Sequence, residues 1–260
     1  MSKFIDKLNG LSRGEFKPIG FGVRQAASPR PKIQLVAALA QESAGVLTDC
    51  VTEADAGLLC ISRLSSGVKA IEKVSRACPD IPWGGWLKGV GLTQIKQMAR
   101  ISCDFLAFPS AGTPLSIFKN NEVGRILEVE SALAEGLLRV VDELPVDAVL
   151  VTCGGQEGGF LTWQHLMLFQ RFADLLTKPL LASIPSVVTA DELRSLWEAG
   201  VEGVVIEIKA GQPPDRLKKL RQVVDALDFP PQRRHERAGP LLPRIGGEMG
   251  MSPEEEEEDE

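Results

Sequence analysis

Eight short apolar runs, each followed by a stretch with helical spacing, repeat along the chain from residue 33 to about residue 227. The runs are five to seven residues long and consist mostly of Leu, Val, Ile, Ala and Phe without polar alternation. Such continuous runs are typical of strands buried on both faces of a parallel sheet. They cover residues 33–39, 57–61, 81–87, 104–108, 125–129, 148–153, 179–184 and 203–208.

Apolar residues spaced three and four apart predict helices between these runs. One predicted stripe contains Leu133, Leu137, Leu138, Val141 and Leu144, and another contains Leu217, Leu220, Val224 and Leu227. Thr189 followed by Glu192 is the pattern of a capping box, and Gly200 stands where that helix should end. The helices would therefore connect successive parallel strands.

Eight strand and helix units of this size predict the α/β class and a single (βα)8, TIM-like barrel. The alternative is an open doubly wound sheet, which usually has fewer units. We expect an N-terminal helix and irregular extension over residues 1–31, the barrel over 32–228, and a disordered tail over 229–260. The extension is expected either to close the bottom of the barrel or to pack on a second subunit.

The composition of the chain favours one domain without membrane segments. Its 260 residues are 44% hydrophobic and 25% charged, enough to bury a full core. No apolar run approaches the roughly 20 residues that span a bilayer, and the N-terminus lacks the apolar centre of a signal peptide. The five cysteines are widely spaced and show no zinc-binding pattern, which favours a reducing, cytoplasmic location and no metal site.

The net charge of -6 comes from the C-terminus, because residues 254–260 are all acidic. The remainder is close to neutral, so the sequence predicts no nucleic-acid partner and no membrane partner. The tail also carries a basic patch at Arg233, Arg234 and Arg237. It is interpreted either as a solubilising segment or as a docking segment for a protein partner, and the sequence leaves homo-oligomerisation open.

Polar residues follow many of the strands, at the end where active sites of such barrels lie. The predicted catalytic residues are Lys88, Glu128, Glu130, Glu207 and Lys209. Residues two apart on a strand share a face, so carboxylates and amines would converge at the barrel mouth as acids, bases or anion clamps. A desolvated lysine would also permit Schiff-base chemistry. The alternative is an internal salt-bridge network without catalysis.

A second group of residues is predicted to bind a small-molecule ligand. It contains Arg63, Gly154, Gly155, Gln156, Ser183, Ser186 and Gly211. Four glycines between residues 154 and 159 predict either a lid or a flexible turn. His165, near the start of the next helix, is expected either to reach the substrate or to cap that helix. The glycines at 84 and 85 are expected either to make room for Trp83 and Trp86 to fill the barrel or to let the backbone yield to a ligand.

The stretch of residues 178–208 resembles the seventh and eighth units of the phosphate-binding eight-stranded barrels. That superfamily includes thiamine-phosphate and tryptophan-pathway enzymes and flavin-mononucleotide oxidoreductases. The resemblance implies a phosphate held by glycine-rich strand ends. Here those positions hold Ser183 and Ser186, and Glu207, Lys209 and Gly211. A carboxylate at Glu207 would repel phosphate.

Three functional hypotheses remain from the sequence. The first is a lyase or isomerase that acts on a small oxygenated metabolite with the carboxylates and lysines above, and it needs no cofactor. The second is an FMN-dependent oxidoreductase, which the resemblance implies. The third is a non-catalytic barrel that binds a metabolite or a protein.

Overall fold

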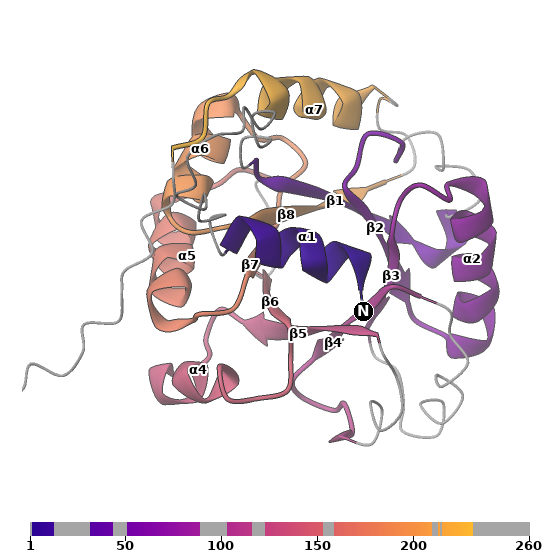
Figure 1. Cartoon of the computed structure of the whole chain (residues 1–260), viewed down its shortest axis with the longest axis horizontal. Helices are drawn as coiled ribbons and strands as arrows, with labels where there is room; N and C mark the ends of the chain where they lie inside the picture. Colours follow the sequence, from indigo (N-terminus) through magenta and orange to yellow (C-terminus); the bar gives the residue numbers. More distant parts are fainter. Residues whose placement is uncertain are drawn as a thin grey trace, which may run out of the picture.

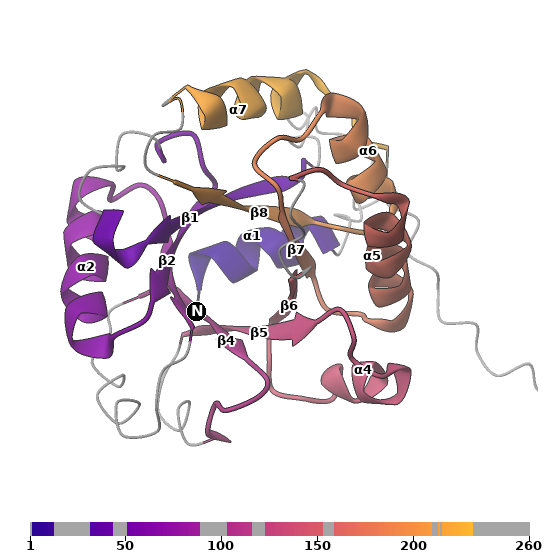
Figure 2. The ribbon, with the colours of Figure 1, turned by 180° about the vertical axis from the view of Figure 1, so that it is seen from behind.

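A computed structural model of the chain shows eight parallel strands that close into a barrel in chain order. The structure describes residues 2–12, 32–43, 51–88, 103–115, 123–152, 159–209, 213 and 215–230. The strands are β1 (Gln34–Ala40), β2 (Ala56–Ile61), β3 (Trp83–Leu87), β4 (Phe105–Pro109), β5 (Gly124–Glu130), β6 (Ala148–Thr152), β7 (Leu180–Ile184) and β8 (Gly203–Ile208). Figures 1 and 2 show the ring from its two ends.

The strand predictions and the TIM-like barrel are confirmed. Each of the eight apolar runs overlaps one strand, with ends that differ by at most two residues, and the pairing of β8 with β1 excludes the open sheet. The third strand begins at Trp83 rather than at Ile81, directly after Pro82. Proline has no amide hydrogen to donate to the strand ladder, so the strand begins only at the residue after the proline.

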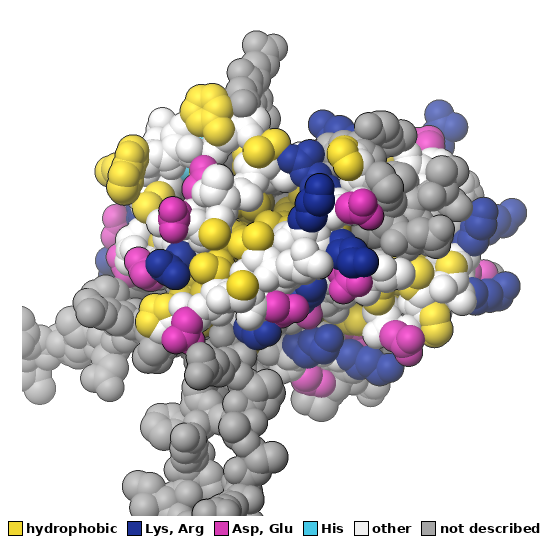
Figure 3. Space-filling model, turned by 90° about the horizontal axis from the view of Figure 1, so that it is seen from above, with side chains coloured by type: hydrophobic (Ala, Val, Ile, Leu, Met, Phe, Trp, Pro, Cys, Tyr) yellow, Lys and Arg dark blue, Asp and Glu magenta, His cyan; other side chains and the backbone are white. Residues whose placement is uncertain are grey.

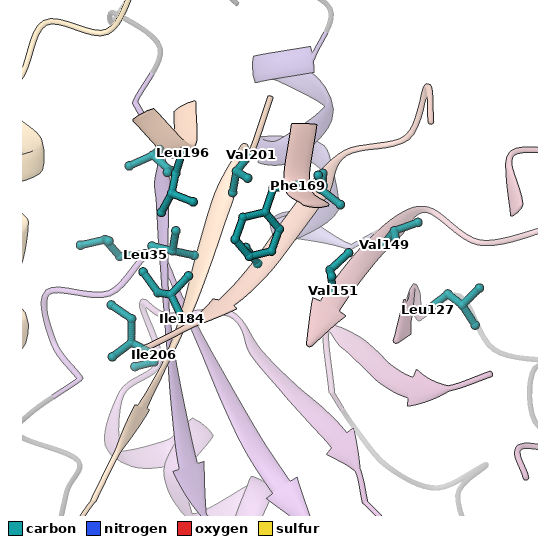
Figure 4. Close-up of a cluster of buried hydrophobic side chains, with 14 of the residues drawn as sticks. Leu35, Leu127, Val149, Val151, Phe169, Ile184, Leu196, Val201 and Ile206 are labelled. Atoms are coloured by element: carbon teal, nitrogen blue, oxygen red, sulfur yellow. The ribbon is translucent and has the colours of Figure 1, made fainter. Parts of the chain in front are cut away.

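Side chains alternate between the inside of the barrel and the layer of helices outside it. The inner cluster contains Val36, Ala38, Ala56, Leu58, Trp86, Phe105, Ala107, Ile126, Ala148, Leu150, Leu181 and Val205. The intervening residues form a larger core with the helices. Figure 4 shows part of this outer core, with Leu35, Leu127, Val149, Val151, Phe169, Ile184, Leu196, Val201 and Ile206 labelled. The alternation therefore fixes which residues can face a site inside the barrel.

Helix α1 (Lys3–Ser12) closes the amino end of the barrel, as one of the two expectations for the extension proposed. Phe4, Ile5 and Leu8 are buried in the inner cluster, and the ring of Phe4 lies 4.8 Å from that of Phe105. Asp104 holds the start of the helix, because its carboxylate accepts hydrogen bonds from the amides of residues 3 and 4 at 2.8 and 2.9 Å. Figure 1 shows α1 lying across the ring.

Glycines in the strands make room for large side chains, but the ring beside Gly84 belongs to Phe105 and not to a tryptophan of β3 as expected. A Cβ on Gly84 would lie 2.3 Å from the ring of Phe105, and one on Gly57 would lie 2.4 Å from Trp83. The two tryptophans of β3 point in opposite directions, because Trp83 belongs to the outer core and Trp86 to the inner cluster. Only one of them therefore fills the barrel.

The described helices outside the barrel include α2 (Leu64–Ala77), α4 (Glu135–Val141), α5 (Trp163–Leu175), α6 (Ala190–Glu198) and α7 (Arg216–Ala226). The capping box of α6 is confirmed, since Thr189 and Glu192 each accept the backbone amide of the other. Gly200 follows with φ of +90°, a conformation that favours glycine. His165 caps α5 in the same manner by accepting the amide of Thr162 at 3.1 Å.

The predicted stripe before β6 is only partly correct. Leu138 and Val141 are buried, whereas Leu137 and Leu144 are exposed. Leu137 and Leu138 are adjacent, so a helix turns their side chains about 100° apart and both cannot face the core. In contrast, Leu217, Leu220 and Val224 of α7 are all buried as predicted.

Several predictions lie outside the described residues. They include the irregular part of the extension and the acidic, disordered tail, because residues 13–31 and 231–260 are not described. Among the helices that are described, none has the length and hydropathy to cross a membrane.

Candidate functional site at the barrel mouth

The inner faces of the strands change from apolar to polar toward the carboxyl end of the barrel. Beyond the apolar cluster, the same faces present Cys60, Lys88, Glu128, Glu130, Thr152, Ser183, Glu207 and Lys209. These residues come from six strands and would meet at one opening, since parallel strands all end at the same edge. We refer to this set together with Trp86 as the barrel mouth.

Lys88 and Glu207 join opposite parts of the mouth. The Nζ of Lys88, which follows β3, lies 3.3 Å from Oε1 of Glu207 on β8. Lys209 lies 3.9 Å from the other oxygen of the same carboxylate. The side chains of Lys88 and Glu207 remain 44% and 45% exposed, so both still reach the solvent where a ligand would enter.

Trp86 connects the cation to a second carboxylate. The Nζ of Lys88 lies 3.8 Å from the centre of a Trp86 ring, a cation–π contact. The indole nitrogen of Trp86 donates a hydrogen bond of 2.6 Å to Oε2 of Glu128. Because Lys88 and Glu128 contact the same buried indole, both lie within the span of one small molecule.

The carboxylates of the mouth differ in their partners. Glu207 is paired with two lysines. Glu128 is half-buried, and within the described part of the chain no lysine or arginine forms an ion pair with it. Glu130 is exposed at the end of β5, on the same face. Glu128 is therefore the carboxylate whose negative charge is least compensated among those near Trp86.

Cys60 lies on the inner face of β2, below these charges. Burial is the main cause that raises the pKa of its thiol to about 11; Glu207, Glu128 and Glu42 raise it further, while Lys88 lowers it. The thiol is thus protonated near neutral pH and is a poor nucleophile there.

The predicted ligand-binding residues do not all reach the mouth. Arg63 is exposed at the start of α2, where its amide donates to Oε1 of Gln41 at 3.4 Å. The side chain of Ser183 lies on the inner face of β7, next to Thr152 in the register. Ser186 contributes its carbonyl, which accepts a 2.7 Å hydrogen bond from Nε of Arg216.

Gly154, Gly155, Gln156 and Gly211 lie outside the described residues, and so does the predicted lid. Their assignment to ligand binding stays a prediction. In the described part of the chain, no three His, Cys, Asp or Glu side chains are grouped so that they could hold a metal ion.

The ends of β7 and β8 are where a flavin phosphate would bind in the resembled superfamily. The described residues there place the Glu207 carboxylate inside the mouth, and residue 185 is a proline without an amide hydrogen. A carboxylate at this position would repel a phosphate, but it is paired with Lys88 and Lys209, so binding of FMN stays a prediction.

Sequence reasoning missed two contributors to this region. Trp86 was interpreted as a packing residue only, and Arg216 was not considered. Trp86 is two residues before Lys88 and thus on the same face of the strand, so the alternation alone could have placed its indole in the site. No local pattern indicates that Arg216 contacts Ser186, which lies 30 residues earlier.

No protein-family model matches the chain, and no curated protein matches it. Solved structures do match. Two variants of the tryptophan synthase alpha-subunit from the hyperthermophile Pyrococcus furiosus each give a TM-score of 0.60, with 13% and 14% identity. The matches cover 75% of this chain and 97% and 98% of those chains. At such identity the likeness concerns the fold alone, and the chain is a (βα)8 TIM-barrel protein of no specific family.

Proposed function

We propose that the barrel mouth is the active site of an enzyme of the lyase or isomerase type that acts on a small oxygenated metabolite. The observation that carries this proposal is the shared indole: Lys88 stacks on Trp86 while Glu128 accepts its N–H. A cation and a carboxylate are thereby held at fixed positions in one opening. The solved structures with a similar fold are subunits of a synthase, which is consistent with an enzyme.

Lys88 is the proposed electrophilic group. Glu207 and the Trp86 ring orient its ammonium, which has three N–H donors and is not fully enclosed. A remaining donor would bind a carbonyl oxygen of the substrate. It would stabilise the negative charge that develops on this oxygen in the transition state, the contribution that is usually largest in enzymes. Lys209 would add a second positive charge at the rim.

Glu128 is the proposed general base. Its Oε2 accepts the indole hydrogen bond, which leaves Oε1 to remove a proton from the carbon next to the carbonyl. The electron pair of the broken C–H bond moves to the carbonyl oxygen, where Lys88 faces it. In an isomerase, a proton passes from the hydroxyl on the deprotonated carbon to the former carbonyl oxygen, and Glu128 returns its proton to the former carbonyl carbon. In a lyase, the electron pair re-forms the carbonyl and a carbon–carbon double bond as the hydroxyl on the next carbon leaves, and Glu128 protonates this hydroxyl so that it departs as water. Glu130, on the same face, is the second acid or base candidate.

The first test is native mass spectrometry of the full chain purified without added ligand, followed by proton exchange in D2O with pyruvate and hydroxyacetone as probes. We expect a bound small molecule and exchange of the carbon-bound protons next to the carbonyl. Lys88→Met and Glu128→Gln should abolish the exchange while the protein stays folded. Lys69→Met, on the exposed face of α2, is the matched control and should behave as the wild type.

Three results would argue against the proposal. Exchange that persists in both folded variants would remove Lys88 and Glu128 from the mechanism. A wild-type protein without a bound molecule and without exchange would favour the non-catalytic barrel. A yellow protein with bound flavin would instead favour the oxidoreductase.

A further inference from the structure

A cavity of about 430 Å³ opens on the outer surface of the barrel, between the starts of α5 and α6. Its walls are mainly apolar and include Phe160, Leu161, Trp163, Leu166 and Leu196, with Glu192 at its edge. Trp163 and Phe160 are large aromatic residues, yet they are 81% and 63% exposed. We call this site the α5/α6 cavity, and none of its residues belongs to the barrel mouth.

The surroundings of the α5/α6 cavity are also apolar. Met167, one turn after Trp163, and Val187, just before α6, are 72% and 64% exposed. Figure 3 views the molecule from the side of α6 and α7, and hydrophobic side chains project at its upper left. Contiguous apolar surface on a soluble domain usually marks an interaction site, because its exposure to water is unfavourable.

We propose that residues 240–245 of the same chain, with the sequence Pro-Leu-Leu-Pro-Arg-Ile, dock into the α5/α6 cavity. Leu241 and Leu242 are the adjacent leucines of the C-terminal segment that follows residue 230, which lies outside the described residues. Two leucine side chains match an apolar cavity of this size. The inference does not depend on the proposed function of the barrel mouth.

The last described residues place the start of this segment next to α6, which lines the α5/α6 cavity. The indole nitrogen of Trp197, on α6, donates a 2.6 Å hydrogen bond to the carbonyl of Pro230. The ring of Phe229 packs 5.3 Å from that of Trp197. The segment therefore leaves the barrel from α6, the same helix that forms one wall of the cavity.

The length of the connecting chain fits the distance. Along α6, Trp197 and Glu192 are about 7.5 Å apart at 1.5 Å per residue. The eleven residues that follow Pro230, up to Leu241, reach at most about 40 Å, and a flexible chain of this length has a mean span of about 17–20 Å. A tether of this kind gives an effective concentration in the millimolar range, so even weak docking would be populated.

The charges along the proposed path are complementary. Helix α6 carries three acidic residues and one basic residue: Asp191, Glu192, Glu198 and Arg194. Residues 231–245 carry four arginines and one acidic residue: Arg233, Arg234, Arg237, Arg244 and Glu236. The basic stretch would lie along the acidic helix while the two leucines enter the cavity. The attraction should weaken with salt, because these charges are exposed.

The test uses fluorine NMR of the full chain labelled with 5-fluorotryptophan, which gives one signal for each of the four tryptophans. Trp163→Phe identifies the signal of Trp163. In the wild type this tryptophan should be shielded from solvent by the docked segment. The double variant Leu241→Ser, Leu242→Ser should shift its signal and increase the difference between H2O and D2O, while the Trp83 and Trp86 signals stay in place.

The matched control is Met249→Ser, Met251→Ser, which alters apolar residues beyond the docking segment and should change no signal. A Trp163 signal that is identical in the wild type and in the double leucine variant would overturn the proposal. A shift that depends on protein concentration over a hundredfold dilution would also overturn it, because the occupant would then be the segment of a second copy.

Discussion

The two ends of the barrel are built on the same eight strands and have opposite character. At the amino end, the inner faces are apolar, and Phe4, Ile5 and Leu8 of α1 seal them. At the carboxyl end, the same faces carry charges. On β5 the inner face changes from apolar to charged within two residues, since Ile126 is buried in the inner cluster and Glu128 faces the mouth.

This contrast separates the part of the barrel that holds the fold together from the part that is available for chemistry. Apolar burial at the amino end stabilises the fold by about 25 cal/mol for each Å² removed from water. The half-exposed ion pairs at the mouth contribute far less. The proposed function gives these charges a role, because they lie at the end where barrel enzymes bind their substrates. The following changes test that division, beginning with the largest expected effect.

Phe4→Ala should damage the amino end most. The residue is fully buried against Phe105, and truncation of such an aromatic side chain typically costs about 3–5 kcal/mol because it leaves a cavity. Urea denaturation of the full chain measures this as a lower free energy of unfolding. Lys7→Ala, on the exposed face of α1, is the control and should change it by less than about 0.5 kcal/mol. Equal effects of the two variants would mean that α1 does not seal the barrel.

The two ends also differ in the expected reactivity of their cysteines. Burial raises the pKa of Cys60 at the mouth to about 11 and, together with Asp104, that of Cys103 at the amino end to about 12. Since only the thiolate reacts, alkylation of Cys60 near pH 8 should be about a hundredfold slower than that of an ordinary thiol, and should rise about tenfold per pH unit. Peptide mass spectrometry after iodoacetamide treatment measures both rates.

Substitutions at the barrel mouth should change the alkylation rate of Cys60 and leave that of Cys103 unchanged. Lys88 lowers the pKa of Cys60, so Lys88→Met should slow its alkylation further. Glu207 raises that pKa, so Glu207→Gln should accelerate the reaction. Cys103 serves as the internal control, because neither residue contributes to its pKa. Equal changes at both cysteines would indicate general unfolding instead.

Asp104→Ala should weaken the amino end by a smaller amount than Phe4→Ala. The carboxylate accepts hydrogen bonds from two amides of α1 and from the hydroxyl of Ser2 at 2.8 Å. Loss of a capping carboxylate typically costs about 1–2 kcal/mol in the free energy of unfolding, which urea denaturation resolves. Asp6→Ala, exposed in the same helix, should be nearly neutral. A neutral Asp104→Ala would show that the cap is dispensable.

The sequence predicted much of the fold because the information is local and periodic. Each strand is marked in the sequence by a short apolar run. The start of α6 is marked by Thr189 and Glu192, which are three positions apart. The error at Leu137 and Leu144 has a physical reason: five apolar residues in twelve do not say which of them a short helix turns inward.

The site was less accessible to such reasoning. Alternation predicted that Glu128 shares a face with Glu130 and Glu207 with Lys209, because that depends only on counting by two, and the structure shows that both faces point inward. It did not predict that Lys88 pairs with Glu207, since the two are 119 residues apart and meet only when the barrel closes. The cap of α1 by Asp104 is a contact of the same kind, because it joins residues about 100 positions apart in the sequence. No local pattern marks it.

The smallest expected effect is the energy of the Lys88 and Glu207 pair, and it bears most directly on what the mouth is for. The pair is half-exposed, so a double-mutant cycle of Lys88→Met and Glu207→Gln should give a coupling of about 0.2–1 kcal/mol in urea denaturation. The surface pair of Arg139 and Glu135, with 3.0 Å between its atoms, is the matched reference and should give a similar value. A coupling above about 3 kcal/mol at the mouth alone would identify a pair that holds the barrel together, and the charges would then need no catalytic explanation. A value near the surface reference would show that the pair stabilises the fold no more than an ordinary surface pair does, which agrees with the proposed division between the two ends.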